Sequence, residues 1–247
     1  MAELRNDFKS VKLENILFLD IETVSQQAEF STLDEKSKYL WEKKAQRITD
    51  DGKTAEDSYN KAGMYSEFGK IVCISVGYIK SNEQIKTLRI KSFYGDDEKK
   101  ILSDFNALVN KYFNSGEHYL CAHNGKEFDF PFIARRALIH GLSIPSCLDT
   151  RGLKPWEVKH FDTMELWRFG DYKNYTSLET LTHVFTIPTP KDDITGAQVG
   201  EVYWKQNDIT RIAVYCQKDV IAIVQLFLRF KNESLIEDVN IMYADKL

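Results

Sequence analysis

The chain lacks the long apolar segments that place a protein in a membrane. No apolar run approaches the ~20 residues that a membrane-spanning helix needs, and the N-terminus, MAELRNDFKS, has no apolar core of a secretion signal. Cysteine is scarce, and no pair has the CxxC spacing of a zinc or redox motif. We therefore expect a cytoplasmic protein with no membrane partner, whose thiols are reduced and buried. The cysteines are Cys73, Cys121, Cys147 and Cys216.

Glycine, proline and excess positive charge are also in short supply. The chain has 12 Gly and 5 Pro, and its net charge is −4, which argues against a large basic face for holding nucleic acid. An enzyme that binds a polyanion transiently needs no such face, because bound divalent cations offset clustered acids. With 247 residues, 43% of them hydrophobic, the chain can bury a sizeable core. This length fits one α/β domain with an insertion, or two small domains.

Hydrophobic periodicity predicts three consecutive strands and then alternating helices and strands. That order is typical of one α/β domain, which we expect to span residues 1–247. Residues 25–63 are the exception, because they are highly charged and only partly helical in pattern, and we interpret them as a helical insertion packed on the domain. The expected strands are 15–21, 70–80, 87–95, 118–124 and 159–163, and the expected helices are 96–113, 131–141, 176–185 and 208–231.

Two acids end the first predicted strand, in the sequence LFLDIET. Residues i and i+2 of a strand point to the same side, so the carboxylates of Asp20 and Glu22 are brought together. Like charges held this close repel each other unless a cation lies between them, and hard oxygen ligands suit magnesium or manganese. Taken alone, the pair is equally explained as an exposed strand end or a helix N-cap.

Two further motifs contribute acids from distant segments. Asp129, in NGKEFDFPF, follows a strand and precedes a helix, where an aspartate is often a structural N-cap. Tyr215 and Asp219, in YCQKD, are four residues apart and share one face of the last helix. Asp219 lies in a strongly apolar stretch, and a buried carboxylate needs a cation as partner. A surface aspartate beside a half-buried tyrosine is the structural alternative.

With these residues in hand, the chain resembles the DEDD superfamily of 3′–5′ exonucleases, also called DnaQ-like, and most closely the proofreading exonuclease domains of family B DNA polymerases. The resemblance covers nearly the whole chain: DIET (20–23), NGKEFD (124–129) and YCQKD (215–219) are similar to the three exonuclease motifs. In the tyrosine subclass, DEDDy, a tyrosine lies four residues before the last aspartate, as Tyr215 does here. The histidine subclass has a histidine five residues before it, where this chain has Val214.

The resemblance implies a ribonuclease-H-like fold, with a mixed five-stranded sheet of three antiparallel and then parallel strands, flanked by helices. It implies hydrolysis at the 3′ end of single-stranded DNA by a stand-alone bacterial enzyme that releases nucleoside 5′-monophosphates. Asp20, Glu22, Asp129 and Asp219 would hold two divalent cations, Mg²⁺ or Mn²⁺, and Tyr215 would orient the attacking water. The residues expected to contact the terminal nucleotide are Thr23, Asn124 and Phe128.

Several weaker signals have plainer explanations. Asp162, after the last predicted strand, fits a turn or a helix cap better than a ligand, and His123 fits a buried strand histidine. Trp167, Tyr172 and Tyr175 are of the type that stacks on single-stranded bases, although their spacing is more typical of core or rim positions.

Rival functions remain open at the level of the sequence. The same chemistry on RNA would use the same motifs, because discrimination depends on contacts to the 2′-hydroxyl that the motifs do not reveal. A second alternative is a non-catalytic nucleic-acid-binding module on this fold, although such a module has no reason to keep every acid. A structural acidic cluster without a ligand is the third. A replication or repair protein as partner is compatible with the sequence, which does not identify one.

Overall fold

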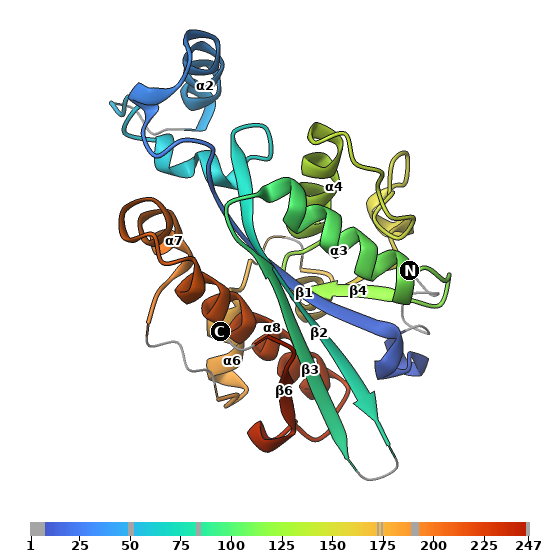
Figure 1. Cartoon of the computed structure of the whole chain (residues 1–247). Coiled ribbons are helices and arrows are strands. Elements are labelled where there is room, and N and C mark those ends of the chain that lie inside the picture. The colour runs from blue at the N-terminus through green and yellow to red at the C-terminus, as the bar shows by residue number, and fades with distance from the viewer. Residues whose placement is uncertain are drawn as a thin grey trace.

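A computed structural model describes residues 8–48, 52–82, 85–171, 173, 175–188 and 193–245, so that Tyr172 lies outside the described residues. A mixed sheet crosses the molecule in the order β5-β4-β1-β2-β3-β6 (Figure 1). No helix among the described residues is long and apolar enough to cross a bilayer. The strands are β1 (Ile16–Ser25), β2 (Gly69–Ser81), β3 (Lys86–Tyr94), β4 (Tyr119–Ala122), β5 (Phe161–Asp162) and β6 (Ile241–Tyr243).

The pairing confirms the predicted class of fold. β1, β2 and β3 form an antiparallel meander, and β4 and β5 extend the sheet beside β1 as parallel strands. This is a ribonuclease-H-like arrangement of antiparallel followed by parallel strands, with helices on its faces. The sheet has one strand more than the five predicted, because β6 joins the free edge of β3 in parallel.

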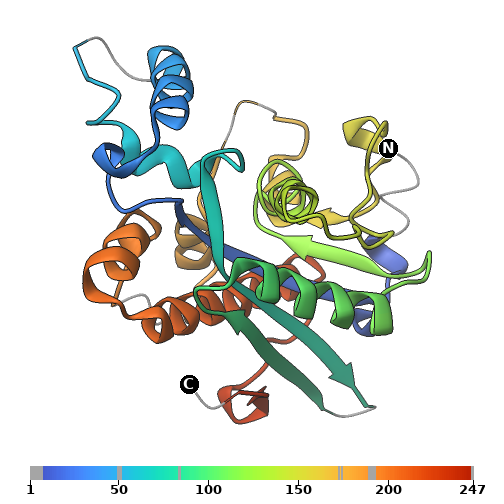
Figure 2. The same cartoon turned by 45° about the horizontal axis from the view of Figure 1, so that its top comes forward.

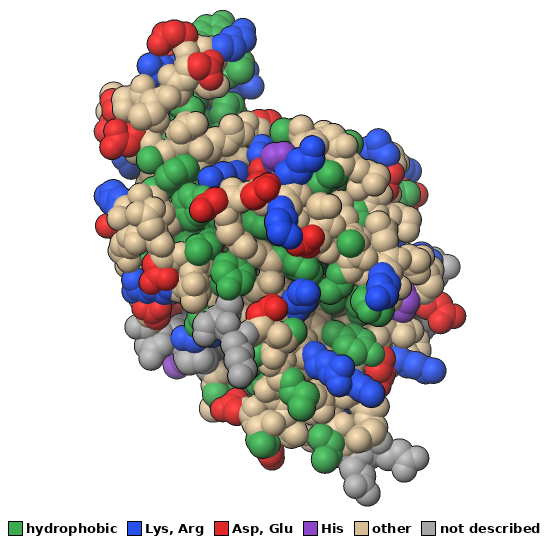
Figure 3. Space-filling model, in the orientation of Figure 1, with side chains coloured by type: hydrophobic (Ala, Val, Ile, Leu, Met, Phe, Trp, Pro, Cys, Tyr) green, Lys and Arg blue, Asp and Glu red, His purple; other side chains and the backbone are tan. Residues whose placement is uncertain are grey.

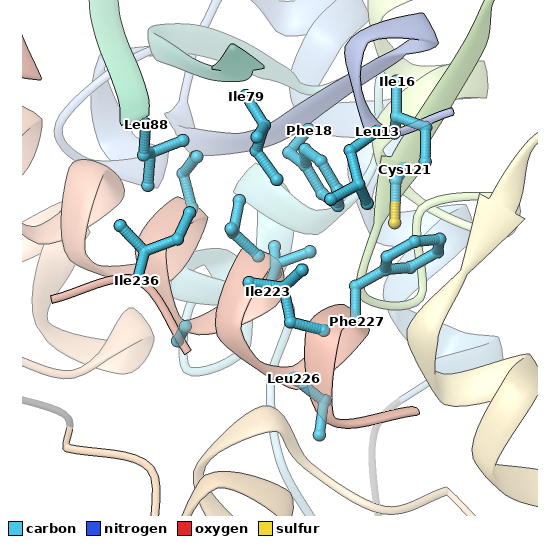
Figure 4. Close-up of a cluster of buried hydrophobic side chains, with 14 of the residues drawn as sticks. Leu13, Ile16, Phe18, Ile79, Leu88, Cys121, Ile223, Leu226, Phe227 and Ile236 are labelled. Carbon is cyan, nitrogen blue, oxygen red and sulfur yellow. The ribbon is translucent and has the colours of Figure 1, made fainter. Parts of the chain in front are cut away.

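Helices cover both faces of the sheet (Figures 1 and 2). On one face α3 and α4 pack on the odd-numbered positions of β1, around Leu17 and Leu19. On the other face α6 and α8 pack on Ile16 and Phe18, and Figure 4 shows Phe18 and Ile79 facing Ile223 and Phe227 of α8. The helices are α2 (Glu35–Ile48), α3 (Glu98–Tyr112), α4 (Asp129–Ile139), α5 (Thr163–Arg168), α6 (Leu178–Val184), α7 (Val199–Glu201) and α8 (Ile209–Phe230).

Local sequence explains where the main helices begin and end. Asp97 caps α3 and Asp208 caps α8, each with its carboxylate accepting a backbone N–H of the first turn. Gly141 has φ of 68° just after α4, the left-handed conformation that ends helices. The helix α6 begins later than the predicted range 176–185, because Ser177 caps it and accepts the N–H of Thr180.

The charged segment after β1 forms a small unit of its own, which projects from the body of the molecule with α2 at its tip (Figures 1 and 2). Its core is Trp41, which is fully buried against Tyr59 and Phe68 and donates a hydrogen bond from Nε1 to the Ala55 carbonyl at 2.8 Å. The unit returns to the sheet through η3 (Tyr59–Met64), and the hydroxyl of Thr23 on β1 donates to the Gly63 carbonyl at 2.7 Å.

Candidate active site

The alternation of β1 determines which way its acids face. Ile16 and Phe18 point toward α8, whereas Leu17 and Leu19 point toward α3 and α4. Because successive strand residues alternate, Asp20 continues the face that looks toward α8. Glu22 follows on the same side, at the point where the register with β2 shifts and forms a bulge.

The helix α8 brings the third motif to these acids. The thiol of Cys216 donates to the backbone oxygen of Asp20 at 3.3 Å and to its Oδ2 at 3.4 Å, so this turn of α8 lies directly against the acidic end of β1. Tyr215 and Asp219 lie one turn apart on α8, close enough for the charge of Asp219 to act on the phenol of Tyr215. The structure therefore brings the first and third motifs together.

The second motif reaches the same place from α4. Asp129 is the first residue of that helix and is 3% exposed. Its Oδ1 accepts a hydrogen bond from the backbone N–H of Ile21 at 3.2 Å. Ile21 lies between Asp20 and Glu22, so the carboxylate of Asp129 reaches β1 at the point where the other two acids lie. Asp129 is at a helix start, as expected, but its carboxylate is directed to β1.

Burial and mutual repulsion dominate the electrostatics of the cluster. Burial raises the pKa of the Asp20 carboxyl well above its ordinary value, and the charges of Glu22 and Asp219 raise it further. Burial likewise raises the pKa of Asp129 to about 8. For Tyr215, burial and then the charge of Asp219 raise the pKa, so the phenol keeps its proton at neutral pH. Such clustering favours a bound cation.

The donor atoms fit a hard divalent cation. Ligand atoms of Asp20, Glu22 and Cys216 lie within 4.8 Å of one another. Burial raises the pKa of the Cys216 thiol, which donates to Asp20 and so stays protonated, unlike a metal-bound thiolate. That leaves carboxylate oxygens, which suit Mg²⁺ or Mn²⁺ better than Zn²⁺. Asp129 and Asp219 flank the pair on β1 and would complete the ligand set.

The residues predicted to contact substrate have different surroundings. The hydroxyl of Thr23 is occupied by the Gly63 carbonyl, and Phe128 is half-buried against Phe132 with ring centroids 5.3 Å apart. Asn124 has φ of 62°, and its buried Oδ1 has no hydrogen-bond partner among the described residues. Their contacts with a nucleotide stay a prediction.

Asp162 and Cys216 make contacts near the acids that the sequence did not predict. Asp162 caps α5, as predicted, but its carboxylate also accepts the N–H of Asn124 at 2.9 Å and of Lys126 at 3.1 Å. It thereby holds the loop that leads to Asp129. Cys216 was predicted only as a buried thiol; its place beside Tyr215, three residues before Asp219, is the signal that puts it on the acidic face of α8.

The histidine beside the second motif is accounted for structurally. Nδ1 of His123 is 2.8 Å from the hydroxyl of Thr163, and its Nε2 is 3.0 Å from the carbonyl of Thr176. Both ring nitrogens are therefore engaged. The prediction of a buried strand histidine is wrong in its setting, because His123 is only half-buried and follows β4, which ends at Ala122.

Comparison with known proteins agrees with this geometry. Residues 64–238 match the profile of a family described as predicted 3′–5′ exonucleases related to the exonuclease domain of PolB. The chain belongs to this exonuclease family. The match includes Asp129, Tyr215 and Asp219, whereas Asp20, Glu22 and most of the projecting unit precede it. No curated protein matches the chain significantly.

Proposed function

We propose that this exonuclease is of the DEDDy type and removes nucleotides from the 3′ end of single-stranded DNA with two divalent cations. The observation that carries the proposal is the convergence of acids from β1, α4 and α8, with Tyr215 one turn from Asp219 on α8. Buried carboxylates that repel one another need metal ions more than any other partner.

Each side chain has a task that follows from its chemistry. Asp20, Glu22, Asp129 and Asp219 would hold Mg²⁺ or Mn²⁺. When bound, two such ions supply a hydroxide nucleophile and stabilise the leaving 3′-oxygen. Tyr215 keeps its proton, so its hydroxyl serves to orient the attacking water and not to act as a base. Because the bond that breaks joins the phosphorus to the leaving 3′-oxygen, the phosphate stays on the released nucleotide, which is a nucleoside 5′-monophosphate.

The proposal extends to the setting of the enzyme. All four cysteines are free thiols, which is typical of the reducing cytoplasm and supports a cytoplasmic location. A replication or repair protein is the kind of partner that a DNA-trimming enzyme would serve.

Trimming of labelled oligonucleotides tests the proposal. With a 5′ label and Mg²⁺, we expect a ladder of shortening DNA products, and with a 3′ label we expect immediate release of a mononucleotide. Asp20→Ala should abolish both. RNA of the same sequence, assayed in parallel, decides between DNA and RNA. Binding of the oligonucleotide without trimming by the wild-type protein would favour the non-catalytic module instead.

A further inference from the structure

Phe169 is an unusual residue for its position. It is 90% exposed, more than any other large apolar side chain among the described residues. It follows α5 with φ of 46° and ψ of 31°, a left-handed conformation that bulky side chains rarely adopt. Gly170 comes next with φ of 94°. Neither packing nor backbone geometry therefore favours an aromatic ring here, and such outliers occur at functional positions.

The segment that carries Phe169 is fastened to the second motif. Asp162, at the start of α5, holds the backbone of Asn124 and Lys126. The ammonium of Lys126 contacts Glu165 of α5 at 2.6 Å. At the end of α5, Nη1 of Arg168 is 3.5 Å from Glu127. The end of α5 therefore lies beside the loop that leads directly to Asp129.

A second exposed ring lies at the same place. Tyr175 is 63% exposed, and the guanidinium of Arg168 lies over its ring at 4.5 Å from the centroid. The Tyr175 hydroxyl is 3.4 Å from Glu127 Oε2. By contrast, Trp167 packs in the interior between Phe185 and Phe230, so it does not belong to this surface. Two open rings beside a guanidinium are what single-strand-binding surfaces present to bases.

We propose that Phe169 and Tyr175 form a stacking platform for bases of the single strand that precede the terminal nucleotide. This inference rests on the proposed exonuclease function. The carboxylates and their cations would hold only the scissile end. On the face that carries α3, shown in Figure 3, acidic and basic side chains are interspersed. Stacking supplies affinity without charge and without base preference, because every base has a π-face.

Substrate length separates this platform from the catalytic centre. For Phe169→Ala we expect KM for longer single-stranded oligonucleotides to rise about tenfold, the usual effect of losing one stacked base. The values of kcat and the cleavage of a dinucleotide should not change. Phe169→Trp should retain the low KM. The control is Tyr112→Ala. Tyr112 is 56% exposed and is the last residue of α3. The next strand, β4, begins opposite Ile16, at the other end of β1 from its acids.

A stability measurement guards against an indirect effect. Asn accepts the left-handed conformation, so Phe169→Asn should keep or raise Tm while showing the same loss of affinity for long strands. An unchanged KM for long strands in Phe169→Ala and Phe169→Asn would overturn the platform and leave the exonuclease proposal intact. An equal rise in KM for the dinucleotide would also overturn it. Failure of the wild-type protein to trim any oligonucleotide would overturn both proposals.

Discussion

At the scale of single residues, Tyr215 is the side chain whose surroundings say most about its use. Burial and three neighbouring carboxylates raise the pKa of its phenol, so it is a hydrogen-bond donor across the physiological range. Among these carboxylates, Asp219, one turn further along α8, has the largest effect on the phenol.

Tyr215→Phe removes the hydroxyl and keeps the ring. We expect kcat for 3′ trimming to fall about 100-fold, within the range for losing one positioned proton-bearing group, with little change in KM. Steady-state trimming kinetics measure both. Tyr203→Phe removes a buried hydroxyl that donates to Asp96 and not to an acid of β1, and it is the matched control. Full activity in Tyr215→Phe would remove this tyrosine from the reaction.

When no metal is bound, burial and mutual repulsion of the acids should lower the free energy of unfolding. Asp129 is buried beside other carboxylates, and Asn at this position could still accept the Ile21 N–H. In a chelating buffer we therefore expect Asp129→Asn to unfold at a higher temperature than the wild type, by roughly 2–4 °C for each kcal/mol relieved. Mn²⁺ should raise Tm of the wild type and have a smaller effect on the variant. The exposed Asp104→Asn is the control; a lower Tm for metal-free Asp129→Asn would contradict the repulsion.

His160 gives the fold a dependence on pH that is separate from the active site. Its Nδ1 accepts the Leu120 N–H at 3.1 Å and its Nε2 donates to the Cys147 carbonyl at 2.7 Å, which fixes the neutral ring. Burial lowers the pKa of His160 to about 4. As pH falls, the histidine therefore takes up a proton in the unfolded chain before it does so in the folded protein. The contribution of this group to the free energy of unfolding is complete above the unfolded pKa of about 6.5 and is lost as pH falls toward 4.

We expect up to about 3 kcal/mol of stability to disappear over that interval through this group. Urea unfolding at about pH 7 and about pH 5 measures it. His160→Gln should be less stable near neutrality but show a smaller difference between the two conditions, whereas the exposed His183→Gln should behave like the wild type. An equal pH difference in His160→Gln would exclude the histidine as its cause.

At the scale of elements, the position of α8 on the sheet decides whether the third motif meets the first. Gly77 of β2 makes the close approach possible, because a Cβ there would lie 2.7 Å from Cγ1 of Val220. Val220 is the neighbour of Asp219, so a shift at this contact is passed directly to the site.

Gly77→Ala should therefore destabilise the protein by about 1–3 kcal/mol through overpacking and lower activity as α8 moves outward. Adding Val220→Ala should recover much of both losses, because it removes the clashing methyl group. Gly200→Ala, where an added Cβ would meet nothing within 4 Å, is the control. Denaturant unfolding and trimming rates provide the measurements; additive losses in the double variant would contradict this account.

Elements were predictable wherever the signal was local. The strand around Phe18 and the helix of Tyr215 follow from periodicity, and the same-side placement of Asp20 and Glu22 follows from the pleat. The bulge after Glu22 and the hydrogen bond from Ile21 to Asp129 join segments more than forty residues apart. No local pattern specifies such contacts, so the sequence predicted candidate residues for the site and not their arrangement.

At the scale of the whole molecule, the number of strands in the sheet likewise could not be predicted from local sequence. β6 has only three residues, and it pairs in parallel with β3 at the far edge, with Ala244 N–H donating to the Ile90 carbonyl at 2.8 Å. A strand this short has no usable periodicity, which is why five strands were expected. The segment after β1 stands out in the sequence by its charge, but its core around Trp41 depends on Tyr59 and Phe68, from its other end.

The central claim is that acids from β1, α4 and α8 together hold two divalent cations. A crystal structure with Mn²⁺ and a nucleoside 5′-monophosphate, recorded at the manganese absorption edge, tests it most directly. We predict two anomalous peaks about 3.5–4 Å apart, bound by the carboxylates of Asp20, Glu22, Asp129 and Asp219. Manganese bound elsewhere, or no manganese among these four carboxylates, would contradict the account.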